Sequence, residues 1–406
     1  MKCVLRLLPM LLCAATPTLA AAPSAIVQAL PSVASSGSQY PHLYDANGQV
    51  YMSWLQQDEG EQVSLWFASL QGNKWSPATA IASGDNWFVN WADFPSLVVL
   101  KDGTLVAHWL QKTALDSYAY DVRLALSADH GKHWQAPFSP HDDGTTTEHG
   151  FVSLLPQPDN TLAAVWLDGR ESKHDEEKMQ LRYARFDSEG KKLSEKVLDS
   201  DTCTCCQTTA VVVPGGIAVG YRDHAAIEIR DIAVMRLQGD QLSEATRVHA
   251  DNWEIPGCPV NGPAMASHGN DLAIAWYTGA QQIPRVQLAF SADGGETFSA
   301  PTRMDDGAPQ GRVAVVMTSA RSAIVSWLER DGEHSALRVR RAERNHANDV
   351  VFGPAVTVAR TSLARSSGFP RLALQNDNVI VAWTHVVEHE PPQVRTAALR
   401  LTDLIH

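Results

Sequence analysis

The sequence predicts an all-β fold, a β-propeller of seven blades closed by an N-terminal strand. The main observation is a strand ending in an aromatic residue, which recurs seven times at intervals between 51 and 57 residues. A period of about fifty residues with four short strands per unit is typical of propeller blades. A second observation is the apolar segment Ser24 to Val33, which has no unit of its own, whereas the last unit is one strand short after Gln393 to Leu401. Pairing the two would close the ring and remove open sheet edges.

The recurring strands are expected to be the second strand of each blade. They are Val50 to Trp54, Leu105 to Trp109, Leu162 to Trp166, Ile217 to Tyr221, Leu272 to Trp276, Ile324 to Trp327 and Val379 to Trp383. Turn signals such as Asp102-Gly103 separate each from an inner strand such as Phe94 to Leu97. A third strand, such as Val122 to Leu126, and an outer strand complete the unit.

Two short segments share a hairpin pattern, SxDxGxTW or SxDxGxTF, at matching places in the second and fifth units. Ser291 to Phe298 matches it fully, and Ser127 to Trp134 has His133 in place of Thr. The Asp accepts hydrogen bonds from the local backbone and the Gly tolerates positive φ, so the chain reverses tightly. This pattern resembles the Asp box of the sialidase and BNR-repeat propellers. The resemblance implies structural hairpins on the outer rim, away from any catalytic centre.

The same resemblance implies expectations about blade number and activity. Sialidases are typically six-bladed, so a six-bladed propeller is the alternative if one unit is an insertion. They hold the substrate carboxylate with three arginines, use a tyrosine activated by a glutamate as nucleophile, and use an aspartate as acid and base. The first arginine belongs to an Arg-Ile-Pro type motif, where this chain has Gln39-Tyr40-Pro41-His42. Classical sialidase activity is therefore not the favoured prediction.

Length and charge fit one exported domain. Lys2, an apolar run from Val4 to Ala15 and small residues up to Ala22 predict a secretory signal peptide at 1–21 and a single propeller at 22–406. The mature protein is expected in the periplasm or outside the cell. With 33 basic and 45 acidic residues, a net charge of −12, nucleic acid and anionic membranes are not expected partners. No later apolar run is long enough for a transmembrane segment.

Four cysteines remain after removal of the signal peptide. Cys203, Cys205 and Cys206 precede the inner strand of the fourth unit, and Cys258 precedes that of the fifth. Links of this kind cross one face of a propeller beside its central channel. The four sulfurs are therefore expected to meet at the mouth.

Two interpretations of the cysteines stay open. Exported cysteines commonly form disulfides, and a pairing of Cys203 with Cys206 and Cys205 with Cys258 fits best. A bridge between Cys205 and Cys206 is disfavoured, because neighbouring Cα atoms are about 3.8 Å apart and an ordinary disulfide needs at least about 4.4 Å. The second interpretation is a thiolate site for copper or zinc, with His224 as an assisting ligand.

Other polar residues are expected on the same face as candidate catalytic groups. Arginines, carboxylates and aromatics in a ring can bind an anionic substrate and supply acid or base groups. The candidates are Asp93, Glu148, Asp168, Arg170, Arg222, Asp223, Tyr277, Arg312 and Arg371. The resemblance makes Arg222, Arg312 and Arg371 candidates for a triad, and Tyr277 or Tyr221 for a nucleophile.

Three functions follow. The favoured one is an exported propeller with a cysteine site at its mouth that binds a soft metal such as copper or zinc. The second is a glycosidase of sialidase type with a rearranged site. The third is a non-catalytic propeller that binds a glycan, a small molecule or a protein, with the cysteines as disulfides.

Overall fold

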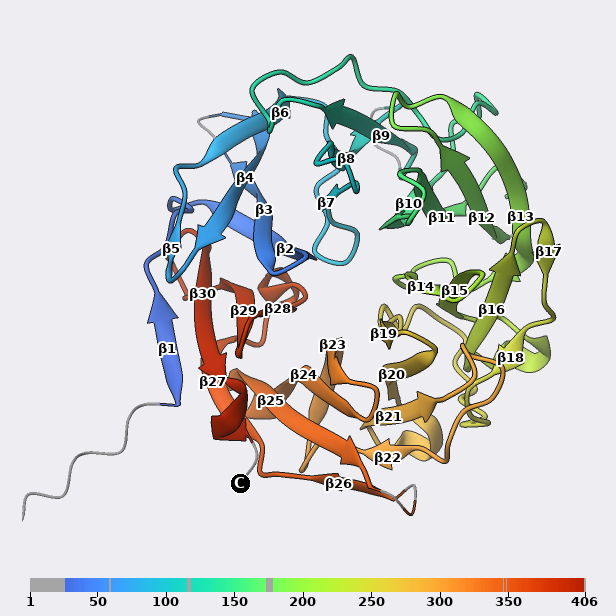
Figure 1. The fold of residues 1–406 in the computed structure, drawn as a ribbon, viewed down its shortest axis with the longest axis vertical. Helices are drawn as coiled ribbons and strands as arrows, with labels where there is room; N and C mark the ends of the chain where they lie inside the picture. Colours follow the sequence, from blue (N-terminus) through green and yellow to red (C-terminus); the bar gives the residue numbers. More distant parts are fainter. Residues whose placement is uncertain are drawn as a thin grey trace, which may run out of the picture.

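The computed structural model describes residues 26–57, 60–114, 118–172, 178–345, 347 and 349–404. Within these residues seven antiparallel sheets follow one another around a central axis (Figure 1). Each aromatic-ended strand expected from the sequence is the second strand of its own sheet. The seven-bladed prediction is therefore confirmed, and the six-bladed alternative is wrong because no unit is an insertion. The signal peptide expected at 1–21 lies outside the described residues.

The strands occupy equivalent positions from blade to blade. The inner strands are β2 (Ser38–Ala46), β7 (Ser96–Val99), β10 (His149–Pro156), β14 (Thr209–Val213), β19 (Ala264–His268), β23 (Pro309–Ser319) and β28 (Arg371–Gln375). The second strands are β3 (Gln49–Gln57), β8 (Leu105–Lys112), β11 (Leu162–Asp168), β15 (Gly216–Arg222), β20 (Asp271–Thr278), β24 (Ser322–Asp331) and β29 (Asn378–His385). The third strands are β4 (Val63–Gln71), β9 (Tyr120–Ser127), β12 (Met179–Phe186), β16 (Ile232–Gln238), β21 (Arg285–Ser291), β25 (His334–Arg344) and β30 (Gln393–Arg400).

The outer position is the least regular. It holds β5 (Lys74–Trp75), β6 (Thr79–Gly84), β13 (Lys192–Thr202), β17 (Gln241–Leu242), β18 (Thr246–Arg247), β22 (Thr302–Arg303), β26 (Val350–Phe352), β27 (Val356–Ser362) and β1 (Val27–Leu30). In the second blade, an isolated β-bridge between Leu124 and Phe138 stands where the other blades have an outer strand. The helical segments of the described residues are four 3-10 turns, η1 (Ala226–Glu228), η2 (Ala280–Gln282), η3 (Arg365–Ser367) and η4 (Leu401–Leu404).

The N-terminal strand closes the ring. β1 is the outer strand of the last blade and pairs antiparallel with β30, with Val27 opposite Leu399 and Leu30 opposite Thr396. In Figure 1 the blue and red ends of the chain accordingly lie side by side. Closure by an N-terminal strand is confirmed, and the pairing covers an edge that β30 would otherwise expose.

The core lies between neighbouring blades. Each apolar cluster draws on two adjacent sheets; one joins Phe290 of β21 to Trp327 of β24, and another joins Leu337 of β25 to Trp383 of β29. The aromatic residues that end the second strands are all buried. Burial of such large side chains at every blade contact is what holds the ring together.

The two Asp-box hairpins have the expected local geometry. Asp293 accepts hydrogen bonds from the Thr297 backbone N–H at 3.0 Å and from its hydroxyl at 2.5 Å. In the first copy, Asp129 accepts from the His133 backbone N–H at 2.9 Å and lies 2.6 Å from its Nδ1. His133 therefore takes the place of the threonine.

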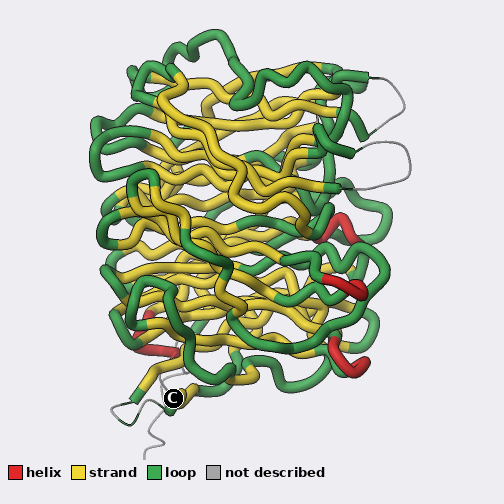
Figure 2. Tube along the Cα trace, turned by 90° about the vertical axis from the view of Figure 1, so that its right-hand side faces the viewer, coloured by secondary structure: helices red, strands yellow, loops and turns green. Residues whose placement is uncertain are grey.

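The two faces of the disc differ. Figure 2 shows the strands crossing the disc, with loops and short helical turns at both of its faces. Within the part of the chain that the structure describes, no helix has the length and apolar character needed to span a membrane.

Candidate metal centre and ligand cavity

The mouth of the propeller is shaped by irregular inner strands. The ladders of β2, β10 and β23 shift register where Tyr40, Phe151 and Arg312 stand, and these residues have φ of 53°, 52° and 56°. Such bulges are common beside functional sites, because they redirect a side chain away from the sheet. A positive φ is costly for a residue with a large side chain, so these positions carry local backbone strain.

A cavity of about 550 Å³ opens at this face. Aromatic and charged side chains line one part of it, among them Trp91, Tyr118 and Glu148. Cys205 and Cys258 also line the cavity. A hollow of this size, with apolar walls and a few polar groups, has the character of a small-molecule site.

The four cysteines come together at the edge of this cavity, as the repeat predicts. The Sγ atoms of Cys203, Cys205 and Cys206 all lie within 4.8 Å of one another. Cys203 Sγ is 3.9 Å from Cys205 Sγ and 2.6 Å from Cys206 Sγ. Cys258 reaches the cluster from the link before β19, where its thiol interacts with that of Cys205. All four are free thiols in this structure.

The Cys203 to Cys206 spacing is the exceptional one. A disulfide bond is about 2.05 Å long, whereas a tetrahedral thiolate site with metal–sulfur bonds of about 2.3 Å separates its sulfurs by about 3.8 Å. The 3.9 Å spacing of Cys203 and Cys205 fits the metal geometry, and the 2.6 Å spacing is closer to a disulfide. The position of the Cys206 sulfur therefore distinguishes a metal-bound thiolate site from a disulfide between Cys203 and Cys206.

Two arginines set the charge around the sulfurs. Arg230 Nη1 lies 3.7 Å from Cys203 Sγ, and its Nη2 donates to Glu228 at 2.7 Å. Burial alone would raise the pKa of the Cys203 thiol, but hydrogen bonds from the neighbouring thiols and the charge of Arg222 lower it overall. The hydrogen bond with Cys205 lowers the pKa of Cys258 to about 7. Positive charge is therefore placed where thiolates form.

His224 lies beside the cluster but is engaged elsewhere. Its Nδ1 is 2.9 Å from Asp201 Oδ1 and its Nε2 is 3.4 Å from Glu228 Oε1. The hydrogen bond to Asp201 helps to raise the pKa of His224 although partial burial opposes this. The imidazole interacts with two carboxylates rather than with a thiol.

Asp93 and Glu148 are brought together by a tyrosine that the sequence reasoning missed. The buried Tyr120 hydroxyl lies 2.9 Å from Asp93 Oδ2 and 2.7 Å from Glu148 Oε1. Burial raises the pKa of Asp93 to about 8, and the charge of Glu148 adds to this effect. Since the hydroxyl has only one proton, a proton on Asp93 satisfies the second short contact.

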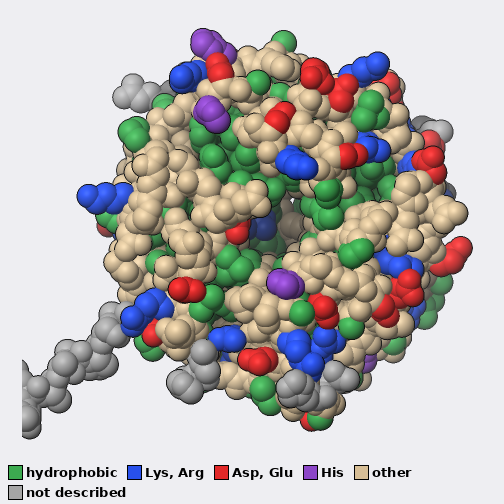
Figure 3. Space-filling view, viewed as in Figure 1, with side chains coloured by type: hydrophobic (Ala, Val, Ile, Leu, Met, Phe, Trp, Pro, Cys, Tyr) green, Lys and Arg blue, Asp and Glu red, His purple; other side chains and the backbone are tan. Residues whose placement is uncertain are grey.

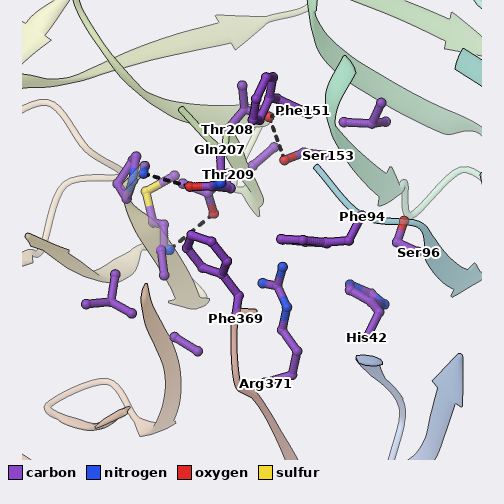
Figure 4. Close-up of a pocket in the computed structure, with 18 of the residues that line it drawn as sticks. His42, Phe94, Ser96, Phe151, Ser153, Gln207, Thr208, Thr209, Phe369 and Arg371 are labelled. Atoms are coloured by element: carbon purple, nitrogen blue, oxygen red, sulfur yellow. Dashed lines mark hydrogen bonds between the residues drawn. The ribbon is translucent and has the colours of Figure 1, made fainter. Parts of the chain in front are cut away.

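The central channel is a separate and narrower space. A cavity of about 200 Å³ lies among the inner strands, and Figure 4 shows the Arg371 side chain reaching between Phe94 and Phe369. The Arg371 guanidinium stacks 4.2 Å above the Phe94 ring. Burial lowers the pKa of Arg371 to about 10. Figure 3 shows the centre of one face hollowed and bordered by hydrophobic side chains.

The other two arginines proposed for a triad have their own partners. Arg222 is buried and donates to the backbone carbonyls of Asn261, Arg230 and Tyr277. Arg312 stacks 4.8 Å from the Trp91 ring and donates to the Gly368 carbonyl at 3.2 Å. Arg222, Arg312 and Arg371 therefore have different hydrogen-bond and stacking partners.

The remaining candidates also separate into local groups. Tyr277 packs edge-on against Trp253, with ring centroids 5.6 Å apart. Asp223 accepts from the His224 backbone N–H at 2.9 Å, and burial raises its pKa. The buried Asp168 forms an ion pair with the partly buried Arg170, whose Nη2 lies 2.7 Å from Asp168 Oδ2.

A second cluster of potential ligands surrounds this ion pair. His149 and Asp143 form a group of potential ligands with Asp168, and His141 Nδ1 lies 3.2 Å from Asp143 Oδ2. His141 and Asp143 lie in an irregular link without a repeat position. Their proximity to β10 was not readable from spacing.

Comparison with known proteins gives the fold and no family. No protein-family model matches the chain, and no curated protein matches it. The polysaccharide lyase Uly1 is similar in structure, with a TM-score of 0.54 and 10% identity over 89% of each chain. The likeness is one of fold.

Two other solved structures are less similar. The GH93 α-L-arabinofuranosidase of Fusarium graminearum in complex with arabinobiose has a TM-score of 0.47 and 13% identity over 94% of this chain and 99% of that one. The Hadza microbial sialidase Hz136 has a TM-score of 0.44 and 15% identity over 72% of this chain and 63% of its own.

Proposed function

We propose that this protein is an exported propeller that binds one soft metal ion, copper(I) or zinc(II), at its mouth. Cys203, Cys205 and Cys206 would supply three sulfur ligands and Cys258 the fourth. The observation that carries the proposal is the approach of four thiols from two successive links, three of them within 4.8 Å of one another. Soft thiolate ligands favour these metals over hard cations.

Charge supports the same proposal. Several thiolates held together repel one another, and a bound cation relieves that repulsion. The guanidinium of Arg230, 3.7 Å from Cys203 Sγ, offsets part of the remaining negative charge. Metal binding requires the Cys206 sulfur to move away from Cys203 by about 1 Å, since tetrahedral sulfurs stand about 3.8 Å apart.

Access supports a role in metal handling rather than a sealed structural site. Cys203 and Cys206 are buried, whereas Cys258 is exposed and borders the 550 Å³ cavity with Cys205. A metal ion, a donor protein or a small ligand could therefore reach the sulfurs from the mouth. Export, with removal of residues 1–21, would place this site in the periplasm or outside the cell.

Serine variants test the ligand set. Cys203→Ser and Cys205→Ser are expected to weaken metal binding at least about 100-fold, because even changes to partners of metal ligands cost about 10- to 100-fold. Cys258→Ser, which retains the three sulfurs that lie within 4.8 Å of one another, should bind more weakly than the wild type and more tightly than those variants. Competition with a chromogenic chelator measures the affinity, and the intact mass reports removal of residues 1–21.

Thr204→Ser is the matched control, since it changes the same loop without changing a sulfur. It should bind metal as the wild type does. Equal affinity in the wild type, Cys203→Ser and Cys205→Ser would contradict the thiolate site.

A second candidate function is cleavage of a glycan in the same cavity. The contact of Tyr120 with both Asp93 and Glu148 favours it, because paired carboxyl groups are the usual acid and base of glycoside hydrolysis. Glu148 also borders the cavity. Turnover of fluorogenic sialosides or arabinosides should then be abolished by Glu148→Gln and retained by Asp142→Asn, a change at an exposed carboxylate. No turnover across a broad panel of sugars would reject this candidate.

A further inference from the structure

We infer that the propeller holds a second metal site, for a divalent transition-metal cation such as zinc(II), between its second and third blades. The ligands are His149 Nε2, Asp143 and Asp168, whose ligand atoms lie within 4.8 Å of one another. His141 Nδ1 and His149 Nε2 each lie 3.2 Å from Asp143 Oδ2. His149 Nε2 is 3.6 Å from Asp168 Oδ1.

The hydrogen-bond partners of His149 fix which nitrogen carries the proton. Its Nδ1 faces the carbonyl oxygens of Tyr120 at 3.3 Å and Thr147 at 3.2 Å, so Nδ1 must be the N–H donor. Its Nε2 is fully buried, has no hydrogen-bond partner and is directed at carboxylate oxygens. A lone pair in that position is repelled by the carboxylates, and a metal ion bound between them, or a proton on Nε2, relieves that repulsion.

His141 contacts the same Asp143 oxygen through its Nδ1. The Ser139 hydroxyl donates to the Val122 carbonyl at 2.7 Å, so its oxygen accepts from His141 Nε2 at 3.1 Å. This leaves the Nδ1 lone pair of His141 facing Asp143. The two rings stack with centroids 3.8 Å apart and planes 4° apart. Because the two ring planes are parallel, their in-plane lone pairs cannot converge on one cation, so His141 is a neighbour of the site and not a ligand.

Partners around the ligands match those of established metal sites. A ligating histidine commonly donates its other N–H to a carbonyl, as His149 does here. Asp143 accepts from the Thr145 backbone N–H at 3.0 Å, and Asp168 accepts from the Trp166 indole at 2.8 Å. Arg170 Nε donates to Asp168 Oδ1 at 2.7 Å and its Nη2 lies 3.2 Å from Asp143 Oδ2, so the guanidinium would remain a hydrogen-bond partner of both carboxylates.

The site would also brace the wall of the mouth. Glu148 and Gly169 border the large cavity, and the adjacent residues His149 and Asp168 are opposite one another in the β10–β11 ladder. A cation bound behind that ladder would fix both strands. It would be independent of the cysteine cluster, which lies at the links before β14 and β19.

Cobalt(II) titration tests the inference, because nitrogen and oxygen ligation lacks the sulfur-to-cobalt charge-transfer bands of a thiolate site. Wild-type protein should bind one equivalent of cobalt(II) that adds no charge-transfer band. Any cobalt(II) bound by the cysteines would come in addition and would show such bands. His149→Gln and Asp143→Asn should each weaken that binding at least about 100-fold. His133→Gln, at an exposed rim histidine, is the control and should bind normally.

Nitrogen NMR of the histidine side chains keeps the test decisive if a variant fails to fold. In metal-free wild-type protein, added zinc(II) should shift Nε2 of His149 and leave its Nδ1–H in place. Protonation of both nitrogens that persists with excess zinc(II), or binding of cobalt(II) through sulfur alone, would overturn the inference.

Discussion

Burial sets the protonation of Asp93. Its pKa is raised from 3.8 to about 8 in the folded protein, chiefly by burial, so the folded state binds one proton more than the unfolded state between these values. The free energy of unfolding should therefore fall as pH rises from about 4 to 8, by roughly 1 kcal/mol per pH unit, and level off above the folded pKa.

Asp93→Asn should remove this contribution. Asparagine has the same shape and stays neutral, so the variant should lose less stability than the wild type between pH 5 and 8. Denaturant unfolding across this range measures the difference, with Asp142→Asn as an exposed control. Parallel pH profiles of wild type and Asp93→Asn would show that Asp93 is ionised in the fold.

The contacts of a single residue could be predicted from the sequence where its partners lie within a few residues along the chain. His133 was recognised as the departure from the hairpin pattern, and it makes the contacts that Thr297 makes in the other copy. Tyr120 was not recognised as a partner of Asp93 and Glu148. Its hydroxyl direction depends on how β9 packs against the neighbouring links, which no residue spacing encodes.

At the scale of strands, the ring depends on the contact between β1 and β30. Leu30 is buried in the cluster between the last and first blades, whereas Gln28 on the same strand is exposed. Leu30→Asp should lower the free energy of unfolding by about 2 to 4 kcal/mol, through a lost apolar contact and a buried charge.

Gln28→Asp is the matched control and should change stability by less than about 0.5 kcal/mol. Denaturant unfolding and the tendency to aggregate measure both effects, since release of β1 exposes the edge of β30. Equal stability of the two variants would contradict a closing role for β1.

Strand positions were readable because a repeated apolar pattern with turn signals fixes them. The bulges at Tyr40, Phe151 and Arg312 were not, because none is glycine and their positive φ arises from packing at the mouth. These bulges determine where the inner side chains point. The candidate triad of Arg222, Arg312 and Arg371, which came from the resemblance and from strand phase, could not include that redirection.

Across the whole molecule, the repeat predicted seven blades and the meeting of four cysteines. It could do so because a propeller brings every link before an inner strand to the same face. The His141 and His149 cluster lay beyond that reasoning, since its link has no repeat position. Whether the cysteines hold a metal ion or form disulfides depends on shifts of about 1 Å, which are finer than any pattern in the sequence.

Metal and thiol stoichiometry of protein isolated from its own compartment, without reductant or chelator, tests the central proposal most directly. The thiolate site predicts about one copper or zinc per chain that is lost in Cys205→Ser, together with four cysteines that react as free thiols after metal removal. Protein with no copper or zinc at the cysteines and no reactive thiols, its four cysteines paired as two disulfides, would contradict it.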